Sequence, residues 1–249
     1  MRFLLPAIGA TQMMTLRALS FGIGLSALVA PSAAADIVNF SHASGLAATA
    51  EFSMLNATTV RIRLANTSTG VPVGFDSSDQ ILTGITWDAG LLGENAGDPA
   101  IVGGSAAIGA TSMSVNFSTG SYGPGTDIGG EWGFGNSGGS GGLPNMVSGN
   151  TSGVVPFGGA NLDGPASLNG PQGGLVANPT LVSLGGLGAI QHEIVVDITL
   201  DQSIASLSEL LGNGVQVEFG SDAAFIFVPA PATLTLLGVA SLGALRRRR

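Results

Sequence analysis

The sequence predicts an all-β protein with one β-sandwich or jelly-roll-like domain, flanked by a helix at each end. Short apolar runs alternate with polar residues at a period of two, which is typical of strands with one buried face. Stretches rich in glycine, asparagine and proline, which favour turns, separate these runs. The chain also contains 40 glycines, and this abundance suits turns and ordered loops better than helices.

The predicted strands lie at residues 37–40, 48–54, 60–64, 81–87, 112–117, 192–200, 215–219 and 225–228. Alternation is clearest in 48–54 and 60–64, which a turn at Asn56 joins into an antiparallel hairpin with one solvent-facing side. In 192–200, His192 is in phase with the apolar positions, so we expect it in the core or at its rim.

Between residues 120 and 174 the chain has 19 glycines in 55 residues, interrupted by prolines. We expect this segment to be a long irregular insertion that packs on the sheet through its few aromatic residues, with 136–142 mobile. Further along, Ser206 and Glu209 fit a capping box and Gly212 a stop signal, which predicts a short helix over 206–211.

The chain begins with a predicted signal peptide over residues 1–35. Arg2 and Arg17 precede an apolar core at 18–30, and small residues follow it. Ala33 and Ala35 occupy the positions expected before a cleavage site, so cleavage is predicted before Asp36. Met14 offers an alternative start that would give a shorter signal.

The chain ends with a segment of three parts over residues 229–249. Pro229, Ala230 and Pro231 stop the preceding strand, and an uncharged apolar run follows over 232–245. As a helix this run would rise about 21 Å, short of a hydrocarbon core of about 30 Å, so spanning would need local thinning of the bilayer or flanking residues in the interface. Four arginines close the segment, as expected of a cytoplasmic anchor: Arg246, Arg247, Arg248 and Arg249.

This arrangement resembles the PEP-CTERM sorting signal of bacterial surface and secreted proteins, in which a Pro-Glu-Pro motif, an apolar helix and a basic tail are recognised and cut by an exosortase. Here Ala230 stands in place of the acid. The resemblance implies an exosortase-type processing enzyme as a partner, and a precursor held at the inner membrane by its C-terminal helix before it reaches the cell surface or the extracellular space.

The region between the two ends, residues 36–228, is also similar to a group of exosortase-dependent surface proteins with no assigned activity. The stretches that carry this resemblance are Leu64-Ala65-Asn66-Thr67-Ser68, Ile81-Leu82-Thr83-Gly84-Ile85, Gly129-Gly130-Glu131-Trp132, Asn161-Leu162-Asp163-Gly164-Pro165, Asn169-Gly170 and Val217-Glu218-Phe219-Gly220-Ser221-Asp222. It implies a surface location and no catalytic residues.

The body over residues 36–228 is strongly acidic. It holds all 16 acids of the chain and only two basic residues, Arg61 and Arg63, which gives a formal charge of −14. Such a charge repels nucleic acid, so no nucleic-acid partner is predicted. The chain has no cysteine, which excludes disulfides and thiolate sites.

The sequence offers little catalytic chemistry. Residues 135–139, Gly-Asn-Ser-Gly-Gly, resemble the nucleophile motif of chymotrypsin-like proteases, but a serine nucleophile needs a histidine base and a carboxylate. His42 and His192 are the two histidines of the chain, and neither has the context of such a base. A flexible glycine loop is the better interpretation, and we predict no catalytic residue.

Two binding chemistries stay open. Acid-rich stretches at Asp76/Asp79, Asp88/Glu94/Asp98 and Asp197/Asp201 offer oxygen ligands for a structural calcium ion, although they match no known calcium motif, and no cofactor or other metal is predicted. Trp87 and Trp132 are candidates for a platform on which sugar rings stack, although their interpretation as core residues is favoured.

Together these observations predict an exported surface or extracellular-matrix protein with a structural or adhesive role and no enzymatic activity. Two alternatives compete with it. A carbohydrate-binding module would present an exposed Trp87 or Trp132 to extracellular polysaccharide, and a secreted hydrolase would hold two carboxylates about 5–9 Å apart in a cleft.

Overall fold

The computed structural model describes residues 35–89, 97–150, 153–163, 168 and 170–229, which belong to one compact unit. The helices predicted at the two ends lie outside these residues. Within them the protein is built from strands and two short 3-10 turns, which confirms the all-β prediction. No helix in the described part of the chain is long and apolar enough to cross a membrane.

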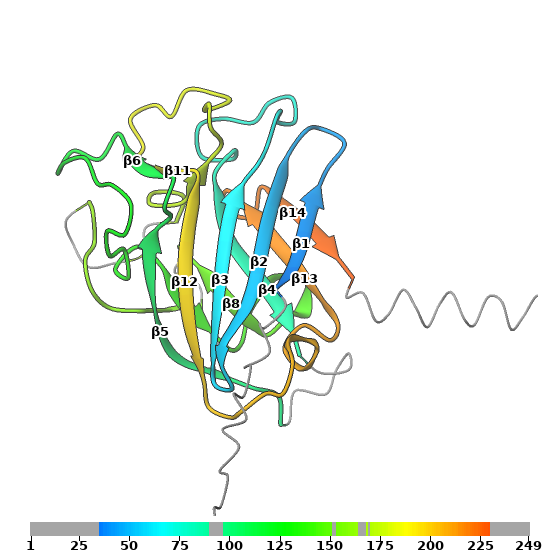
Figure 1. Cartoon of the computed structure of the whole chain (residues 1–249). Coiled ribbons are helices and arrows are strands. Elements are labelled where there is room, and N and C mark those ends of the chain that lie inside the picture. The colour runs from blue at the N-terminus through cyan, green and yellow to red at the C-terminus, as the bar shows by residue number, and fades with distance from the viewer. Residues whose placement is uncertain (1–34, 90–96, 151–152, 164–167, 169, 230–249) are drawn as a thin grey trace, which may run out of the picture. The chain divides into compact units, whose positions relative to one another are not determined.

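The first sheet has five strands, all antiparallel to their neighbours. In spatial order they are β1 (Asp36–Ser41), β2 (Ala47–Asn56), β3 (Thr59–Asn66), β12 (Glu193–Leu200) and β5 (Ile101–Ile108). Figure 1 shows this sheet face on, with β12 inserted beside β3 although it lies far away in sequence. The predicted hairpin is therefore β2–β3, and the predicted strand at 192–200 extends its sheet.

The second sheet has nine strands and is organised around β4 (Leu82–Asp88). β13 (Gly214–Phe219) and β8 (Asn145–Ser148) both pair antiparallel with β4, and β14 (Ala224–Val228) pairs with β13. The shorter strands complete the sheet: β6 (Met113–Val115), β7 (Gly133–Gly135), β9 (Val155–Pro156), β10 (Leu175–Val176) and β11 (Ala189–Gln191).

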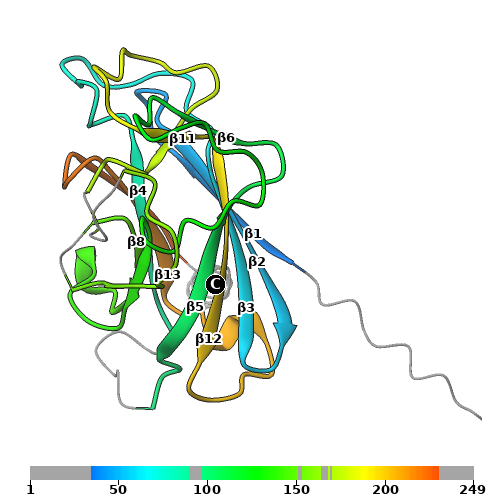
Figure 2. The same cartoon turned by 90° about the vertical axis from the view of Figure 1, so that its left-hand side faces the viewer.

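The main hydrophobic core lies between the two sheets, which Figure 2 shows as two layers. Alternate residues of β3, such as Val60, Ile62 and Leu64, have no exposed surface and belong to the same buried cluster as residues of β4 from the other sheet. Phe52 and Trp87 make an edge-to-face contact across the core, with ring centroids 6.0 Å apart. Each fully buried side chain of this size contributes about 1.5–3 kcal/mol to folding.

The glycine-rich segment is more regular than the sequence predicts. It supplies β7, β8 and β9 to the second sheet, so the prediction of a long irregular insertion is wrong for these residues. β7 requires glycine at position 133 because the backbone of the neighbouring strand β9 is close. A Cβ at Gly133 would lie 2.3 Å from the carbonyl oxygen of Val155. Here glycine allows two backbone segments of a sheet to approach closely, and it does not mark a flexible loop.

The helix predicted over 206–211 is also corrected. The structure has a single 3-10 turn, η2 (Leu207–Glu209), and the side chain of Ser206 makes no capping hydrogen bond. Glu209 Oε2 accepts a hydrogen bond at 3.2 Å from the backbone N–H of Ala205, the residue before the predicted N-cap, so the predicted capping box does not form. This part of the chain closes into a turn that buries Leu207 instead of continuing as a helix.

Candidate functional site

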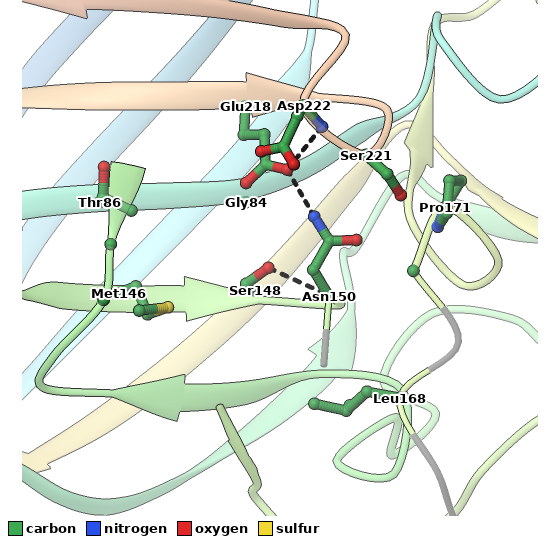
Figure 3. Close-up of a pocket in the computed structure, with 13 residues that line it drawn as sticks. Gly84, Thr86, Met146, Ser148, Asn150, Leu168, Pro171, Glu218, Ser221 and Asp222 are labelled. Carbon is green, nitrogen blue, oxygen red and sulfur yellow. Dashed lines mark hydrogen bonds between the residues drawn. The ribbon is translucent and has the colours of Figure 1, made fainter. Parts of the chain in front are cut away.

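The main candidate site is an open pocket of about 530 Å³ on the outer face of the second sheet. Every residue of β4 is buried, because both faces of this strand are covered. Ile85 and Trp87 belong to the core between the sheets, whereas Gly84 and Thr86 line the pocket on the opposite face. Figure 3 shows the pocket with the side chains that surround it.

The register of three strands sets the floor of the pocket. Gly84 of β4 lies opposite Ser148 of β8 on one side and Glu218 of β13 on the other. Thr86 likewise lies between Met146 and Gln216. Directly opposite residues point to the same face of a sheet, so these side chains gather on one surface.

Glu218 is held in place by hydrogen bonds inside the pocket. Its Oε1 accepts from the side-chain amide of Asn150 at 2.6 Å and from the backbone N–H of Asp222 at 3.2 Å, as Figure 3 shows. Burial raises the pKa of Glu218, and the charge of Asp222 adds to this rise while the two hydrogen bonds oppose it. The carboxyl group of Glu218 is therefore more readily protonated than an exposed glutamate.

Asp222 and Asn150 reach the pocket from turns. Asp222 has a φ of 64°, the left-handed conformation that aspartate tolerates better than most residues, in the turn between β13 and β14. Asn150 follows β8, and its backbone N–H donates to Ser148 Oγ at 2.9 Å. Ser148 Oγ in turn donates to the carbonyl oxygen of Thr83 at 3.1 Å, which ties the turn to the central strand.

Two buried polar atoms of the pocket have no hydrogen-bond partner, Thr86 Oγ1 and Asn150 Oδ1. Buried polar groups are nearly always hydrogen-bonded, so their free capacity favours a polar ligand. Met146, Leu168 and Pro171 add apolar surface to the lining. None of the described lining residues is basic, so the pocket offers hydrogen bonds and apolar contact but no positive charge.

Trp87 and Trp132, the predicted platform, are both fully buried. Trp132 donates its indole N–H to the carbonyl oxygen of Gly173 at 3.0 Å, beneath the glycine-rich segment. Neither ring is available to stack on a sugar in this structure, so the carbohydrate platform at these two residues is not found and their interpretation as core residues is confirmed.

The protease-like motif at 135–139 has a structural role in the loop after β7. Asn136 Oδ1 accepts from the backbone N–H of Ile101 at 2.7 Å, and Asn136 Nδ2 donates to the carbonyl oxygen of Ile101 at 2.8 Å.

His42 pairs with Ser44 in the turn after β1, with 2.7 Å between Nδ1 and Oγ. His192 is half-buried directly before β12, a rim position in line with its sequence pattern.

Several acids of the acid-rich stretches have separate hydrogen-bond or ion-pair partners. Asp76 accepts hydrogen bonds from the hydroxyl and backbone N–H of Ser78, which lower its pKa. Asp197 forms an ion pair with Arg61 at 2.7 Å on the first sheet, and Asp201 accepts from the N–H of Ala100. Among the described residues, no three His, Asp or Glu side chains gather into a group that could hold a metal ion. Glu94 lies outside the described residues.

A buried acid that the sequence did not single out as a site is Glu131. It has no exposed surface, and its Oε1 accepts from the backbone N–H of Leu162 at 2.5 Å, whereas its Oε2 has no partner. Burial is the main cause that raises the pKa of Glu131 to about 7. The contact joins residues 129–132 to residues 161–163.

Most of the predicted sorting residues lie outside the described part of the chain: Ala33, Ala230, Pro231, Arg246, Arg247, Arg248 and Arg249. Ala35 is exposed, Asp36 opens β1, and Pro229 is exposed directly after β14. The first described strand begins at Asp36 and the last one ends at Val228.

The pocket residues were missed because each belongs to an ordinary strand or turn. The alternation in 215–219 already places Gln216 and Glu218 opposite the apolar face of that strand. No signal in the sequence indicates that β13 lies beside β4 and β8, so the gathering of Glu218, Asn150 and Thr86 was not predictable. No protein-family model, curated protein or solved structure matches this chain.

Proposed function

We propose that this chain is an exported bacterial surface or extracellular-matrix protein, sorted through its C-terminal PEP-CTERM-like segment, whose acidic body has an adhesive role. The sorting part of this proposal rests on the sequence: a signal-like start and a C-terminal segment of two prolines, an apolar run and four arginines. An exosortase-type enzyme is the proposed processing partner, and the C-terminal helix is the proposed membrane tether before cleavage.

The adhesive role that fits the geometry best is non-catalytic binding of extracellular polysaccharide in the pocket of the second sheet. The observation that carries it is the pair of unpartnered buried atoms, Thr86 Oγ1 and Asn150 Oδ1, beside the anchored carboxyl group of Glu218. Sugar hydroxyls both donate and accept hydrogen bonds, so they can satisfy all three groups. The acidic body and the absence of basic residues among the described lining residues favour a neutral glycan over an anionic one.

Binding is tested by affinity electrophoresis of the purified protein in gels that contain neutral or uronate-rich polysaccharides. We expect retardation by a neutral polysaccharide and its loss in Asn150→Ala, because this change removes the unpartnered oxygen and the hydrogen bond to Glu218. Thr199→Ala, at an exposed position on the first sheet, is the matched control and should bind as the parent does. Equal mobility of the parent protein in all gels would refute the binding role.

The hydrolase alternative would use Glu218 and Asp222, whose charges interact in the pocket. It is tested by incubating the purified protein with the same polysaccharides and measuring the release of reducing ends. A release of reducing ends that Glu218→Gln abolishes would assign catalysis to this pair. The proposed binding role predicts no release.

Sorting is tested by intact mass and cell fractionation, comparing the full chain with a deletion of residues 232–249. We expect a surface or released product that lacks residues 1–35 and the C-terminal segment, and no such sorting of the deletion variant. A full C-terminus retained in the inner membrane would show that the Pro-Ala-Pro variant is not processed, and would contradict the matrix role.

A further inference from the structure

We propose that Phe225 and Phe227 of β14 form an aromatic platform that continues the floor of the pocket, so that the ligand is an extended neutral glycan chain laid across four strands. This inference rests on the proposed polysaccharide-binding function and adds to it the length of the ligand and a second, apolar binding subsite.

The register places both phenyl rings on the face that carries the pocket. Phe225 lies opposite Glu218, which lies opposite Gly84, which lies opposite Ser148. The neighbouring row runs in the same way through Phe227, Gln216, Thr86 and Met146. Because directly opposite residues share one face, both rings lie on the face that carries the pocket. Gln216 and Thr86 are only 7% and 5% exposed and lie against Gly141 and Gly139, so the open surface follows the row from Phe225 through Glu218 and Gly84 to Ser148, over β14, β13, β4 and β8. Three spacings between adjacent strands make this surface about 14 Å wide, longer than a single sugar ring needs.

Among the described aromatic side chains, only Phe225 and Phe227 are exposed. Phe225 is 40% exposed and Phe227 is 48% exposed, whereas Ile226 between them packs in the core. Large apolar side chains in adjacent exposed positions of one strand are typical of a contact surface. A flat ring offers apolar area at a low cost in conformational entropy, and the C–H face of a pyranose is a flat apolar surface of similar size.

The surroundings of the rings favour a glycan over two other occupants. Glu218 and Asp222 lie on the adjacent strand and turn, and their charges oppose the approach of an anionic lipid surface. A second copy of this chain would bring the same acids against them, on a body with a formal charge of −14. A neutral sugar chain meets no such repulsion and also satisfies the hydrogen-bonding groups of the pocket.

The test measures the binding of neutral oligosaccharides of increasing length to protein purified after expression of the full chain. Affinity of the parent should rise with length until the chain covers both subsites. Phe225→Ser combined with Phe227→Ser should weaken binding of the longest oligosaccharide about tenfold, a loss of about 1.4 kcal/mol, and leave binding of the shortest one unchanged. Phe225→Tyr combined with Phe227→Tyr keeps both rings and should retain the length dependence. Val102→Ser, at an exposed apolar position on β5 of the first sheet, should bind as the parent does.

The outcomes separate this inference from the function on which it rests. If the parent binds no glycan of any length, the proposed function fails. If the parent binds, Asn150→Ala does not, and the double serine variant binds every length as the parent does, the function stands and the platform is refuted. Loss of vesicle binding in the serine variant, with vesicles of anionic phospholipid as the probe, would assign the rings to a membrane instead. A change from dimer to monomer would assign them to self-association.

Discussion

Replacing Glu131 with glutamine should remove much of the pH dependence of stability between about pH 4.5 and 7. Glu131 is fully buried, and its pKa is about 7 in the folded protein against 4.5 for an ordinary glutamate. Below pH 4.5 the carboxyl group is protonated in both states, so it does not affect the balance. As pH rises toward 7 the unfolded chain ionises first, and the folded state progressively loses stability relative to it.

The size of this effect follows from the difference between the two pKa values. One pKa unit corresponds to about 1.4 kcal/mol, so a difference of about 2.5 units lowers the free energy of unfolding by about 3 kcal/mol once Glu131 is ionised in both states. Glutamine resembles the protonated acid in shape and can still accept the hydrogen bond from the N–H of Leu162. Glu131→Gln should therefore be about as stable as the parent at pH 4.5 and more stable by up to about 3 kcal/mol above pH 7.

The measurement is urea unfolding followed by tryptophan fluorescence at several pH values from 4 to 8, taking the difference between variant and parent at each pH. Taking this difference separates the contribution of Glu131 from that of Glu218, whose pKa is also raised, because Glu218 is present in both proteins. Asp36→Asn, an exposed acid on β1, is the control and should leave the pH dependence nearly unchanged. If the free energies of unfolding of Glu131→Gln and the parent differ by the same amount at every pH from 4 to 8, the pKa of Glu131 is not raised by burial and the reasoning is refuted.

Two further changes test how the glycine-rich segment is built into the second sheet. Gly133→Ala should destabilise the fold by about 1–3 kcal/mol because the new Cβ would lie 2.3 Å from the carbonyl oxygen of Val155; thermal unfolding measures this, and Gly103→Ala, where a Cβ meets nothing within 4 Å, should be tolerated. If both variants melt alike, the close approach of β7 and β9 is wrong. Asn136→Ala removes two hydrogen bonds to Ile101 and should cost about 1–3 kcal/mol, and hydrogen exchange should show faster exchange of the Ile101 amide. Unchanged protection at Ile101 would contradict this contact.

The strands with one buried face were predictable from the sequence. In β2 and β3 the alternation of Ala50 and Phe52 with Glu51, and of Ile62 with Arg61 and Arg63, is the pattern of a sheet with core on one side and solvent on the other. The structure confirms both strands and their antiparallel pairing. Here local pattern and tertiary environment agree, so the period of two is sufficient.

The second sheet was predictable only in part. The predicted strands at 81–87, 112–117, 215–219 and 225–228 are confirmed as β4, β6, β13 and β14, whereas β7, β8, β9, β10 and β11 were not predicted. β4 is buried on both faces, so polar Thr86 and apolar Ile85 are both buried, and the strand lacks the exposed polar face of β2 and β3. β7 contains two glycines in three residues, which the sequence suggests is a loop. The candidate site depends on these strands lying side by side, and pairing between distant segments leaves no mark on the composition of either one.

β14 is the last strand in the described part of the chain, and this position has consequences for mechanical loading. It pairs only with β13 among the described strands and packs beside β1, as Figure 1 shows. Any pull on the chain beyond Val228 enters the protein through this edge strand. From there tension passes across five residue pairs, Val215 with Val228 through Phe219 with Ala224, into the strand that carries Glu218. A load between the C-terminal end of β14 and a ligand held on this face would thus pass first through these two adjacent strands.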